Sequence, residues 1–231
     1  MIEPIILILP VYKGKEMTEK CLDSIEKNTK YPYKIIIIID EIDGDEIDNL
    51  YSWQRLMNID LVIRKYREGI ITAINMGMKI ANGDVCFIQN DAEYPILEGD
   101  CWLTRLVKLS KEKDVGMVGC KNSVRDKPQH GYIGGWCCYI PKTTINKVGY
   151  LDMIFNPAQV DDIDYARRVM AHKLKIVTAD FEVKHDGSGT LKDSNVQEEL
   201  KQRNWQLYEE KWKDYREDMS EEEIKKYDYW G

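Results

Sequence analysis

Asp91 stands in a short polar segment that could hold a divalent cation. It follows the apolar run 85–88, with Gln89 and Asn90 directly before it and Glu93 two residues after it. Clustered oxygen donors suit Mg2+ or Mn2+, which bind a few carboxylates together with substrate phosphates. The same residue types are common in turns, so the segment alone could also form an ordinary loop.

His185 is a second residue with possible chemistry. It follows Val183-Lys184 and precedes Asp186 and a glycine- and serine-rich run at 187–190. A histidine at the end of a strand can bind a metal ion or contact a phosphate group. A lone histidine is more often a surface or hydrogen-bonded residue, so this candidate depends on its neighbours.

Three acids fall in the first turn of a helix that helical spacing predicts over 161–172: Asp161, Asp162 and Asp164. The helix dipole and the free N–H groups of a first turn stabilise acids there, which accounts for one or two of them. A carboxylate near a bound diphosphate would also suit a general base that deprotonates a hydroxyl.

Asp40 ends another apolar run, and Asp43 and Asp45 follow it. An acid at the end of a strand can accept hydrogen bonds from a nucleoside, whereas Asp43 and Asp45 fit a polar loop better. The glycine fingerprint of dinucleotide-binding folds and the phosphate-binding P-loop are both absent, which argues against a Rossmann dehydrogenase and a P-loop kinase.

These residues stand at the ends of strand-like segments that alternate with helical ones. Apolar runs predict buried strands at 5–9, 33–40, 59–63, 84–89 and 115–120. Apolar residues at helical spacing predict helices at 17–25, 47–57, 70–81 and 102–109, and Asn82-Gly83 is expected to end the third with a left-handed turn. This order predicts an open, largely parallel sheet with helices on both faces, where ligands bind beyond the carboxyl ends of the strands.

The second half of the chain is more mixed. Short strands are expected at 134–140, 175–177 and 181–184, and from about residue 195 the chain is helical and highly charged. We interpret the acidic tail 217–229 as a solvated helix, with a lid or a homodimer contact as alternatives.

Composition limits the class of protein. The 231 residues suit one α/β domain with appended helices, and the net charge of −7 with scattered Lys and Arg argues against a nucleic-acid partner. Six cysteines without a CxxC pair favour a reduced, cytoplasmic protein. No segment approaches the 18 apolar residues of a membrane span, although peripheral contact with the inner membrane face stays open.

Taken in order, these segments resemble glycosyltransferase family 2, a large group of GT-A nucleotide-sugar transferases. Leu9-Pro10-Val11-Tyr12 is like the family's opening "PVYN", with Lys13 in place of the asparagine. Arg67-Glu68-Gly69, Asn75-Met76-Gly77 and Ala81-Asn82-Gly83-Asp84 resemble the helix before the metal loop. Gln89-Asn90-Asp91 occupies the place of the D-x-D metal motif, although Gln89 replaces the usual first acid.

The resemblance continues downstream and covers roughly residues 4–213. The segment 149–155 looks like the family's "GGFDE…F", and 161–165 with Arg168 resembles "E-D-x-D-L…R". His185 with Thr190 is similar to the "H…T" pair, and 205–212 to a frequent C-terminal element.

The resemblance implies a three-layer α/β/α sandwich with a mostly parallel sheet. Residues 1–192 would form the GT-A domain, with a nucleotide-binding half at 1–120 and an acceptor and catalytic half at 121–192, followed by a charged helical extension at 193–231. A metal-dependent, inverting transfer from a UDP-, GDP- or dTDP-sugar to a glycan, lipid or protein hydroxyl is expected.

The resemblance also assigns roles to individual residues. Asp162 would be the catalytic base, and Asp91 and His185 would hold Mn2+ or Mg2+. Trp136 and Asp161 would face the acceptor, although a buried tryptophan in the core is about as common as one that stacks on a sugar. The donor would contact Pro10, Tyr12, Asp40, Gly69, Asn75, Asn90 and Asp91.

Two other functions fit parts of the sequence. A nucleotidyltransferase that makes nucleotide sugars would share the sheet and the metal, but it needs a glycine-rich basic loop after the first strand, which 11–15 imitates poorly. A nucleotide- or sugar-binding module with a decayed metal site is favoured by Gln89 and disfavoured by Asp91, Asp162 and His185.

Overall fold

The computed structural model describes residues 2–40, 58–125, 131–187 and 194–231. Its main strands are β1 (Ile5–Val11), β2 (Tyr33–Asp40), β3 (Ile59–Arg64), β4 (Val85–Ile88), β6 (Val115–Cys120), β9 (Cys137–Ile140) and β10 (Lys175–Ala179). Short strands β5 (Ala92–Glu93) and β11 (Lys184–His185) pair with each other, as do β7 (Val124–Arg125) and β8 (Tyr132–Ile133).

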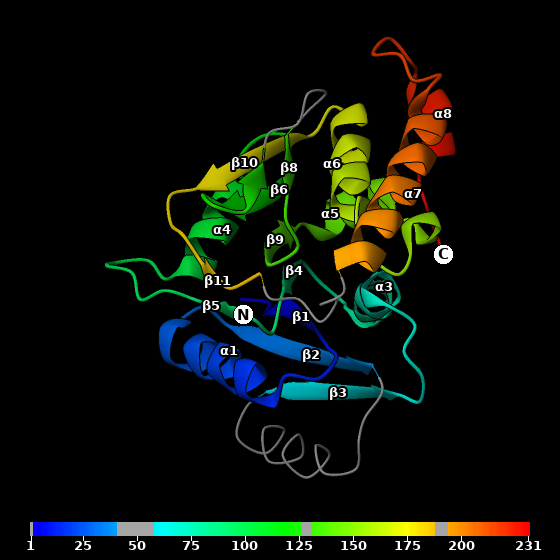
Figure 1. Ribbon diagram of the computed structural model, residues 1–231. Coiled ribbons are helices and arrows are strands. Elements are labelled where there is room, and N and C mark those ends of the chain that lie inside the picture. The colour runs from blue at the N-terminus through cyan, green and yellow to red at the C-terminus, as the bar shows by residue number, and fades with distance from the viewer. Residues whose placement is uncertain (1, 41–57, 126–130, 188–193) are drawn as a thin grey trace.

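The seven main strands form one sheet in the order β10-β6-β9-β4-β1-β2-β3. All neighbouring strands are parallel except β9, which runs antiparallel to β4 and β6. The expected mostly parallel sheet is therefore confirmed, with one reversed strand in its middle. The carboxyl ends of β1, β2 and β4 lie at one edge of this sheet (Figure 1). Asp40 is the last residue of β2, and Tyr12 and Asp91 follow β1 and β4.

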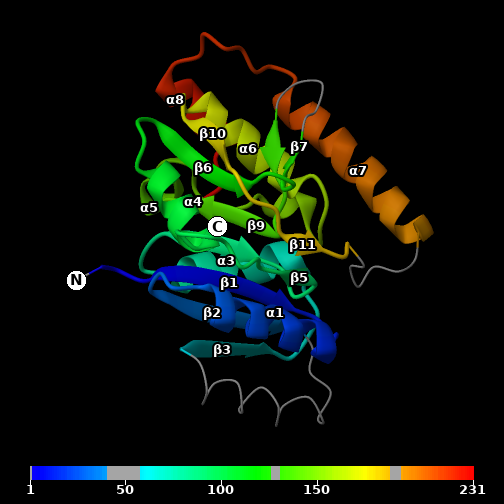
Figure 2. The ribbon, with the colours of Figure 1, turned by 90° about the vertical axis from the view of Figure 1, so that its left-hand side faces the viewer.

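Helices cover both faces of this sheet (Figures 1 and 2). On one face lie α1 (Lys15–Asn28) and α4 (Trp102–Ser110), and their apolar side chains share a buried cluster with alternate residues of β1 and β2. The other face carries α3 (Ile70–Ile80), α5 (Lys142–Val148), α6 (Asp161–Ala171) and α7 (Ser194–Trp212). The expected three-layer α/β/α architecture is confirmed.

The isoleucine run 35–39 fits a strand that is covered on both faces of the sheet. Ile35, Ile37 and Ile39 belong to the cluster under α1, whereas Ile36 and Ile38 belong to the cluster under α3. Successive side chains of a strand point to opposite faces, so only a strand covered on both sides buries every residue of such a run. Gly77 lets α3 approach closely, because a Cβ there would lie 2.6 Å from Cγ2 of Ile8.

Three expectations about local structure were wrong. The helix α3 does not end in a left-handed turn at Asn82-Gly83: Ala81 leaves it in an extended conformation with φ −63° and ψ 127°, and Gly83 has no positive φ. This straight exit brings the carbonyl of Asp84 to the N–H of Ile6, 3.0 Å away, where β4 begins to pair with β1.

The other two concern the second half. The strand expected at 134–140 begins only at Cys137, and the strand expected at 181–184 is replaced by β11, which begins at Lys184. The Asn122 side chain takes the place of a strand partner: it donates to the carbonyl of Val183 (2.7 Å) and accepts from its N–H (3.1 Å). The helix expected at 47–57, and the residues Asp43, Asp45 and Thr190, lie outside the described residues.

The acidic tail is not a solvated helix. Met219, Ile224 and Tyr227 are buried against α6 and α7, although the acids between them are exposed. The tail contains the short helix α8 (Glu221–Ile224) and a 3-10 turn, η2 (Lys225–Tyr227); a second such turn, η1 (Met153–Phe155), precedes α6. No helix among the described residues is long and apolar enough to cross a membrane.

Candidate functional site

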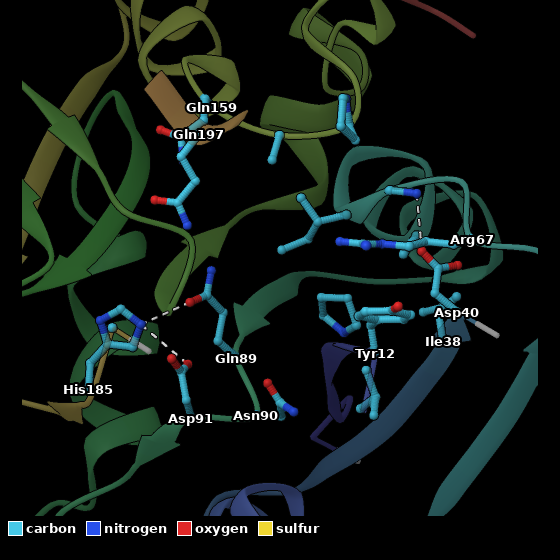
Figure 3. A pocket seen from close by; sticks show the side chains of 18 residues that line it. Tyr12, Ile38, Asp40, Arg67, Gln89, Asn90, Asp91, Gln159, His185 and Gln197 are labelled. Atoms are coloured by element: carbon cyan, nitrogen blue, oxygen red, sulfur yellow. Dashed lines mark hydrogen bonds and ion pairs between the residues drawn. The ribbon is translucent and has the colours of Figure 1, made fainter. Parts of the chain in front are cut away.

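A pocket of about 320 Å3 opens at the carboxyl ends of β1, β2 and β4 (Figure 3). Segments far apart in the sequence line it: the ends of these strands, the start of α3, the loop before α6, the region of β11 and the first turns of α7. The residues that line it include Pro10, Tyr12, Asp40, Arg67, Gly69, Gln89, Asn90, Asp91, Pro157, Ala158, Gln159, His185 and Gln197.

Asp91 and His185 lie side by side in this pocket (Figure 3). The short β5–β11 ladder pairs His185 with Ala92, and the N–H of Asp186 donates to the carbonyl of Asp91. As a result the Nε2 atom of His185 is 3.3 Å from Oδ1 of Asp91 and 3.0 Å from Oε1 of Gln89. The two candidate metal ligands predicted from sequence are therefore brought together.

Their donor set fits a cation that is shared with a ligand. One carboxylate, one imidazole and one amide oxygen converge, and these are O and N donors that Mn2+ or Mg2+ accepts. In the described ranges no three His, Cys, Asp or Glu side chains gather into a metal site. The protein offers Asp91 and His185, with Gln89 beside them, so the remaining coordination positions would have to come from phosphate oxygens or water.

Trp136 lies behind His185 and does not line the pocket. Its indole stacks on the imidazole with ring centroids 4.3 Å apart and planes 8° apart. The carbonyl of Trp136 accepts a hydrogen bond from the buried Tyr94 hydroxyl at 2.7 Å, which fixes the backbone under the ring. The structure thus places Trp136 against the candidate metal ligand and not among the residues that line this pocket.

Asp40 joins the end of β2 to the start of α3. Its Oδ1 accepts from the buried guanidinium of Arg64, and its Oδ2 accepts from the N–H of Gly69 at 3.1 Å. Gly69 adopts φ +95°, and a Cβ on it would lie 2.7 Å from Cα of Pro157. The predicted residues Asp40 and Gly69 therefore form one rigid corner of the pocket.

Tyr12 and Arg67 form a flat surface beside this corner. The guanidinium carbon of Arg67 is 4.0 Å from the centroid of the Tyr12 ring. A cation stacked on an aromatic face makes a platform on which a planar base can lie. From sequence, Arg67 was named only as part of the segment Arg67-Glu68-Gly69 and was given no binding role.

The two predicted asparagines differ in their placement. Asn90 lines the pocket, and its Nδ2 donates to the carbonyl of Lys13 and to Oγ1 of Thr18, each at 3.2 Å. Asn75 is buried away from the pocket, where its amide donates to the carbonyl of Leu151 (2.8 Å) and accepts from its N–H (2.9 Å). Asn75 thus holds α3 to the segment before η1.

The three acids of the first turn of α6 have separate surroundings. Asp164 is fully buried and accepts from Arg168, Lys211 and Trp212, so it belongs to the core. Asp161 and Asp162 are half-buried and lie just after the pocket wall 157–159, although neither lines the pocket. Burial, and to a smaller degree the charge of Asp164, raise the pKa of Asp161 from 3.8 to about 6.

A sequence model described as "Glycosyl transferase family 2" matches residues 6–158. The match covers Pro10, Tyr12, Asp40, Gly69 and Asp91 and ends four residues before Asp162. No curated protein sequence matches the chain significantly.

Solved structures share the fold. The mannosyltransferase PcManGT from Pyrobaculum calidifontis, in complex with GDP-Man and Mn2+, aligns with a TM-score of 0.63 and 18% identity over 76% of this chain and 54% of that one. GalNAc-T7 with UDP, GalNAc and Mn2+ aligns with a TM-score of 0.65 and 13% identity over 76% of this chain and 42% of that one. The chain spans about half the length of these structures.

Proposed function

Because this chain belongs to glycosyl transferase family 2, we propose that it transfers a sugar from a nucleotide diphosphate sugar to an acceptor hydroxyl with the help of a divalent cation. The observation that carries this proposal is the convergence of Asp91 and His185 in the pocket that also holds Tyr12 and Asp40. One end of this pocket suits a nucleoside, and the other suits a diphosphate with its cation.

The nucleoside would bind at the Tyr12 and Asp40 end. The Tyr12–Arg67 platform offers a flat face for the base, and Pro10 borders it. Both oxygens of Asp40 already accept one hydrogen bond each, but a carboxylate oxygen has a second lone pair for a base or ribose donor. Asp40 is thus held ready in one orientation before a ligand arrives.

The diphosphate would bind at the Asp91 and His185 end. These two side chains would hold Mn2+ or Mg2+, which when bound supplies Lewis-acid stabilisation of the charge that develops on the departing nucleoside diphosphate. The two solved structures described above, PcManGT and GalNAc-T7, are complexes with Mn2+. Without such a cation, Asp91 and the phosphates would repel each other, so nucleotide affinity should depend on metal.

Asp162 would take the proton from the acceptor hydroxyl. The hydroxyl oxygen attacks the anomeric carbon, the bond from that carbon to the diphosphate oxygen breaks, and the proton moves to the Asp162 carboxylate. Asp162 stands in the first turn of α6, three residues after Gln159, the last lining residue of the loop before this helix. A single base and a direct displacement predict inversion at the anomeric carbon.

Thermal unfolding with UDP, GDP, dTDP, CDP and ATP, each with and without Mn2+, tests the donor site. A ligand at about 100 times its dissociation constant adds about 2.7 kcal/mol, which for a domain of this size raises Tm by on the order of 5–10 °C. We expect one nucleoside diphosphate to stabilise the protein only with Mn2+, and Asp91→Asn to abolish that shift.

Other outcomes of the same thermal unfolding experiments would favour a different function. Stabilisation by a triphosphate alone would favour the nucleotidyltransferase, and no shift with any nucleotide would contradict the donor site. The base is tested separately with Asp162→Asn, which should keep the metal-dependent shift and lose at least ~100-fold in release of nucleoside diphosphate. Turnover equal to that of the parent would exclude Asp162 as the base.

A further inference from the structure

Three glutamines surround the part of the pocket that lies away from Tyr12 and Arg67. Figure 3 shows Gln159 and Gln197 on the side opposite Asn90, with Gln89 between them and Asp91. Each comes from a different part of the fold: Gln89 follows β4, Gln159 precedes α6, and Gln197 belongs to α7. None of the three was singled out by the sequence as a sugar-binding residue.

We propose that Gln89, Gln159 and Gln197 form a subsite that binds the hydroxyl groups of a neutral sugar ring. This inference rests on the proposed function, since the subsite adjoins the place assigned to the diphosphate. The sugar could be that of the donor or that of an acceptor, and both present the same hydroxyl chemistry to the three side chains.

The side chains that line this subsite favour an uncharged sugar. A carboxamide donates two hydrogen bonds and accepts others, which matches hydroxyl groups that both donate and accept. On this side the described lining residues Pro157, Ala158, Gln159, Gly187 and Gln197 carry no charge. A sugar carboxylate would find no cationic side chain among these five residues, whereas Pro157 and Ala158 suit the C–H surface of a pyranose.

The side chains of Gln159 and Gln197 are available to a ligand. Neither carboxamide pairs with another residue in the part of the chain that the structure describes. The two ends of the Gln89 amide face different groups: its Oε1 lies 3.0 Å from Nε2 of His185, on the side of the proposed cation, which leaves the NH2 group for the pocket. A carboxylate at position 89 would lack this donor, so the glutamine links the candidate metal ligand to the sugar subsite.

The backbone that presents Gln159 is held in an uncommon conformation. Gln159 and Val160 have φ values of 78° and 72°, in the left-handed region that residues other than glycine and asparagine rarely adopt. Such a conformation persists only where the surroundings enforce it. Asn204 is one of the residues that hold this loop in place.

Asn204 is fully buried on α7 and binds this loop from behind. Its Nδ2 donates to the carbonyls of Phe155 (2.7 Å), Ala158 (2.8 Å) and Gln159 (3.0 Å). Gln197 lies seven residues earlier on the same helix, which is two turns and therefore the same face. One face of α7 thus carries a subsite residue and the anchor of the loop that bears another.

The test compares nucleotide and nucleotide-sugar binding. The probes are the nucleoside diphosphate selected by thermal unfolding and its glucose, galactose and N-acetylglucosamine conjugates (glucose and mannose for GDP), titrated calorimetrically with Mn2+. Gln197→Ala and Gln159→Asn are the variants, because position 197 is only half-buried and asparagine tolerates a positive φ. Gln206→Ala, an exposed glutamine of α7 outside the pocket, is the matched control.

We expect each variant to bind the preferred nucleotide sugar about 3- to 10-fold more weakly, as the loss of one hydrogen bond implies, with unchanged affinity for the nucleoside diphosphate. If nucleotide-sugar affinity is unchanged but KM for p-nitrophenyl glycoside acceptors rises by the same factor, the subsite holds the acceptor sugar. Variants that change neither quantity, or that weaken nucleoside diphosphate equally, would overturn the subsite. A parent that binds no nucleotide would overturn the proposed function as well.

Discussion

The imidazole of His185 lies flat on the indole of Trp136, with 4.3 Å between the ring centroids and 8° between their planes. This contact orients the Nε2 atom toward Asp91 and Gln89. A histidine at the end of a two-residue strand would otherwise be free to rotate about its side-chain bonds. The stack therefore gives Trp136 an indirect part in holding the proposed cation.

Replacing Trp136 tests this role. Trp136→Ala removes the stacking surface, so we expect Mn2+-dependent nucleotide affinity to fall about 3- to 10-fold, which corresponds to about 0.5–1.5 kcal/mol of lost aromatic contact. Trp136→Phe should keep most of the affinity because a flat ring remains. Titration of nucleoside diphosphate at fixed Mn2+ measures both. Equal affinity in Trp136→Ala and the parent would mean that His185 needs no support.

Gly69 should tolerate no side chain. Gly69→Ala would place a Cβ 2.6 and 2.7 Å from Cβ and Cα of Pro157, at a φ of +95° that alanine rarely adopts. Because Gly69 N–H also holds Asp40, we expect loss of the metal-dependent nucleotide shift together with a fall in Tm of several degrees. Gly99→Ala is the control: its φ is also positive, at +74°, but a Cβ there meets nothing within 4 Å. A binding loss in Gly99→Ala as large as in Gly69→Ala would contradict this explanation.

The central sheet was predictable from sequence because its signals are local. The isoleucines of β2 could be buried on both faces only in a covered sheet, and the rule for parallel strands then placed Tyr12, Asp40 and Asp91 at one edge. The reversed strand β9 was not predictable, since four buried residues carry no signal of direction.

The subsite of Gln89, Gln159 and Gln197 could not be predicted either, because it depends on contacts between segments far apart in the sequence. Gln197 stands in a charged helical stretch that reads as solvated, and that helix reaches the pocket through contacts with the segment before α6, among them the hydrogen bonds from Arg203 and Asn204 to backbone carbonyls. Asn75 shows the reverse case, because the resemblance suggested a donor contact while the fold uses both ends of its amide on Leu151. For both Gln197 and Asn75, contacts between segments far apart in the sequence decide whether the side chain reaches the pocket.

Asp161 should make stability depend on pH in a known direction. Its pKa is about 6 in the folded protein and near 3.8 in the unfolded protein. Between these two pH values the folded state therefore holds a proton on Asp161 that the unfolded state has lost. Stability contributed by the protonated group is full below about pH 4 and is lost as pH rises through about 6. Asp161→Asn should therefore stabilise the protein at pH 7.5, by on the order of 1–3 kcal/mol, and have little effect at pH 4.

Urea unfolding at pH 4, 5, 6 and 7.5 measures this difference between variant and parent. Asp180→Asn, at a fully exposed carboxylate, serves as the control and should shift stability by less than ~0.5 kcal/mol at every pH. A gain in Asp161→Asn that is the same at pH 4 and 7.5 would show that the effect is not one of ionisation.

Asp164 should behave as a structural residue although it belongs to the same acidic run as Asp162. Its carboxylate has no exposed surface and accepts from Nε of Arg168 (2.8 Å), Nε1 of Trp212 (2.8 Å) and Nζ of Lys211 (2.9 Å). Asp164→Asn would leave the cations of Arg168 and Lys211 without their shared counter-ion. Removing one partner from a buried ionic network costs about 3–5 kcal/mol, so Tm should fall by on the order of 10 °C.

The contrast with Asp162→Asn makes this prediction sharp. Asp162→Asn should lose turnover and keep its Tm, whereas Asp164→Asn should lose Tm and, at a temperature where it is still folded, keep most of its turnover. Glu210→Gln, an exposed acid on α7, controls for the change of charge and should alter neither. An Asp164→Asn protein as stable as the parent would mean that Arg168 is satisfied by the carbonyls of Val148 and Tyr150 alone, to which it donates at 2.9 and 2.8 Å.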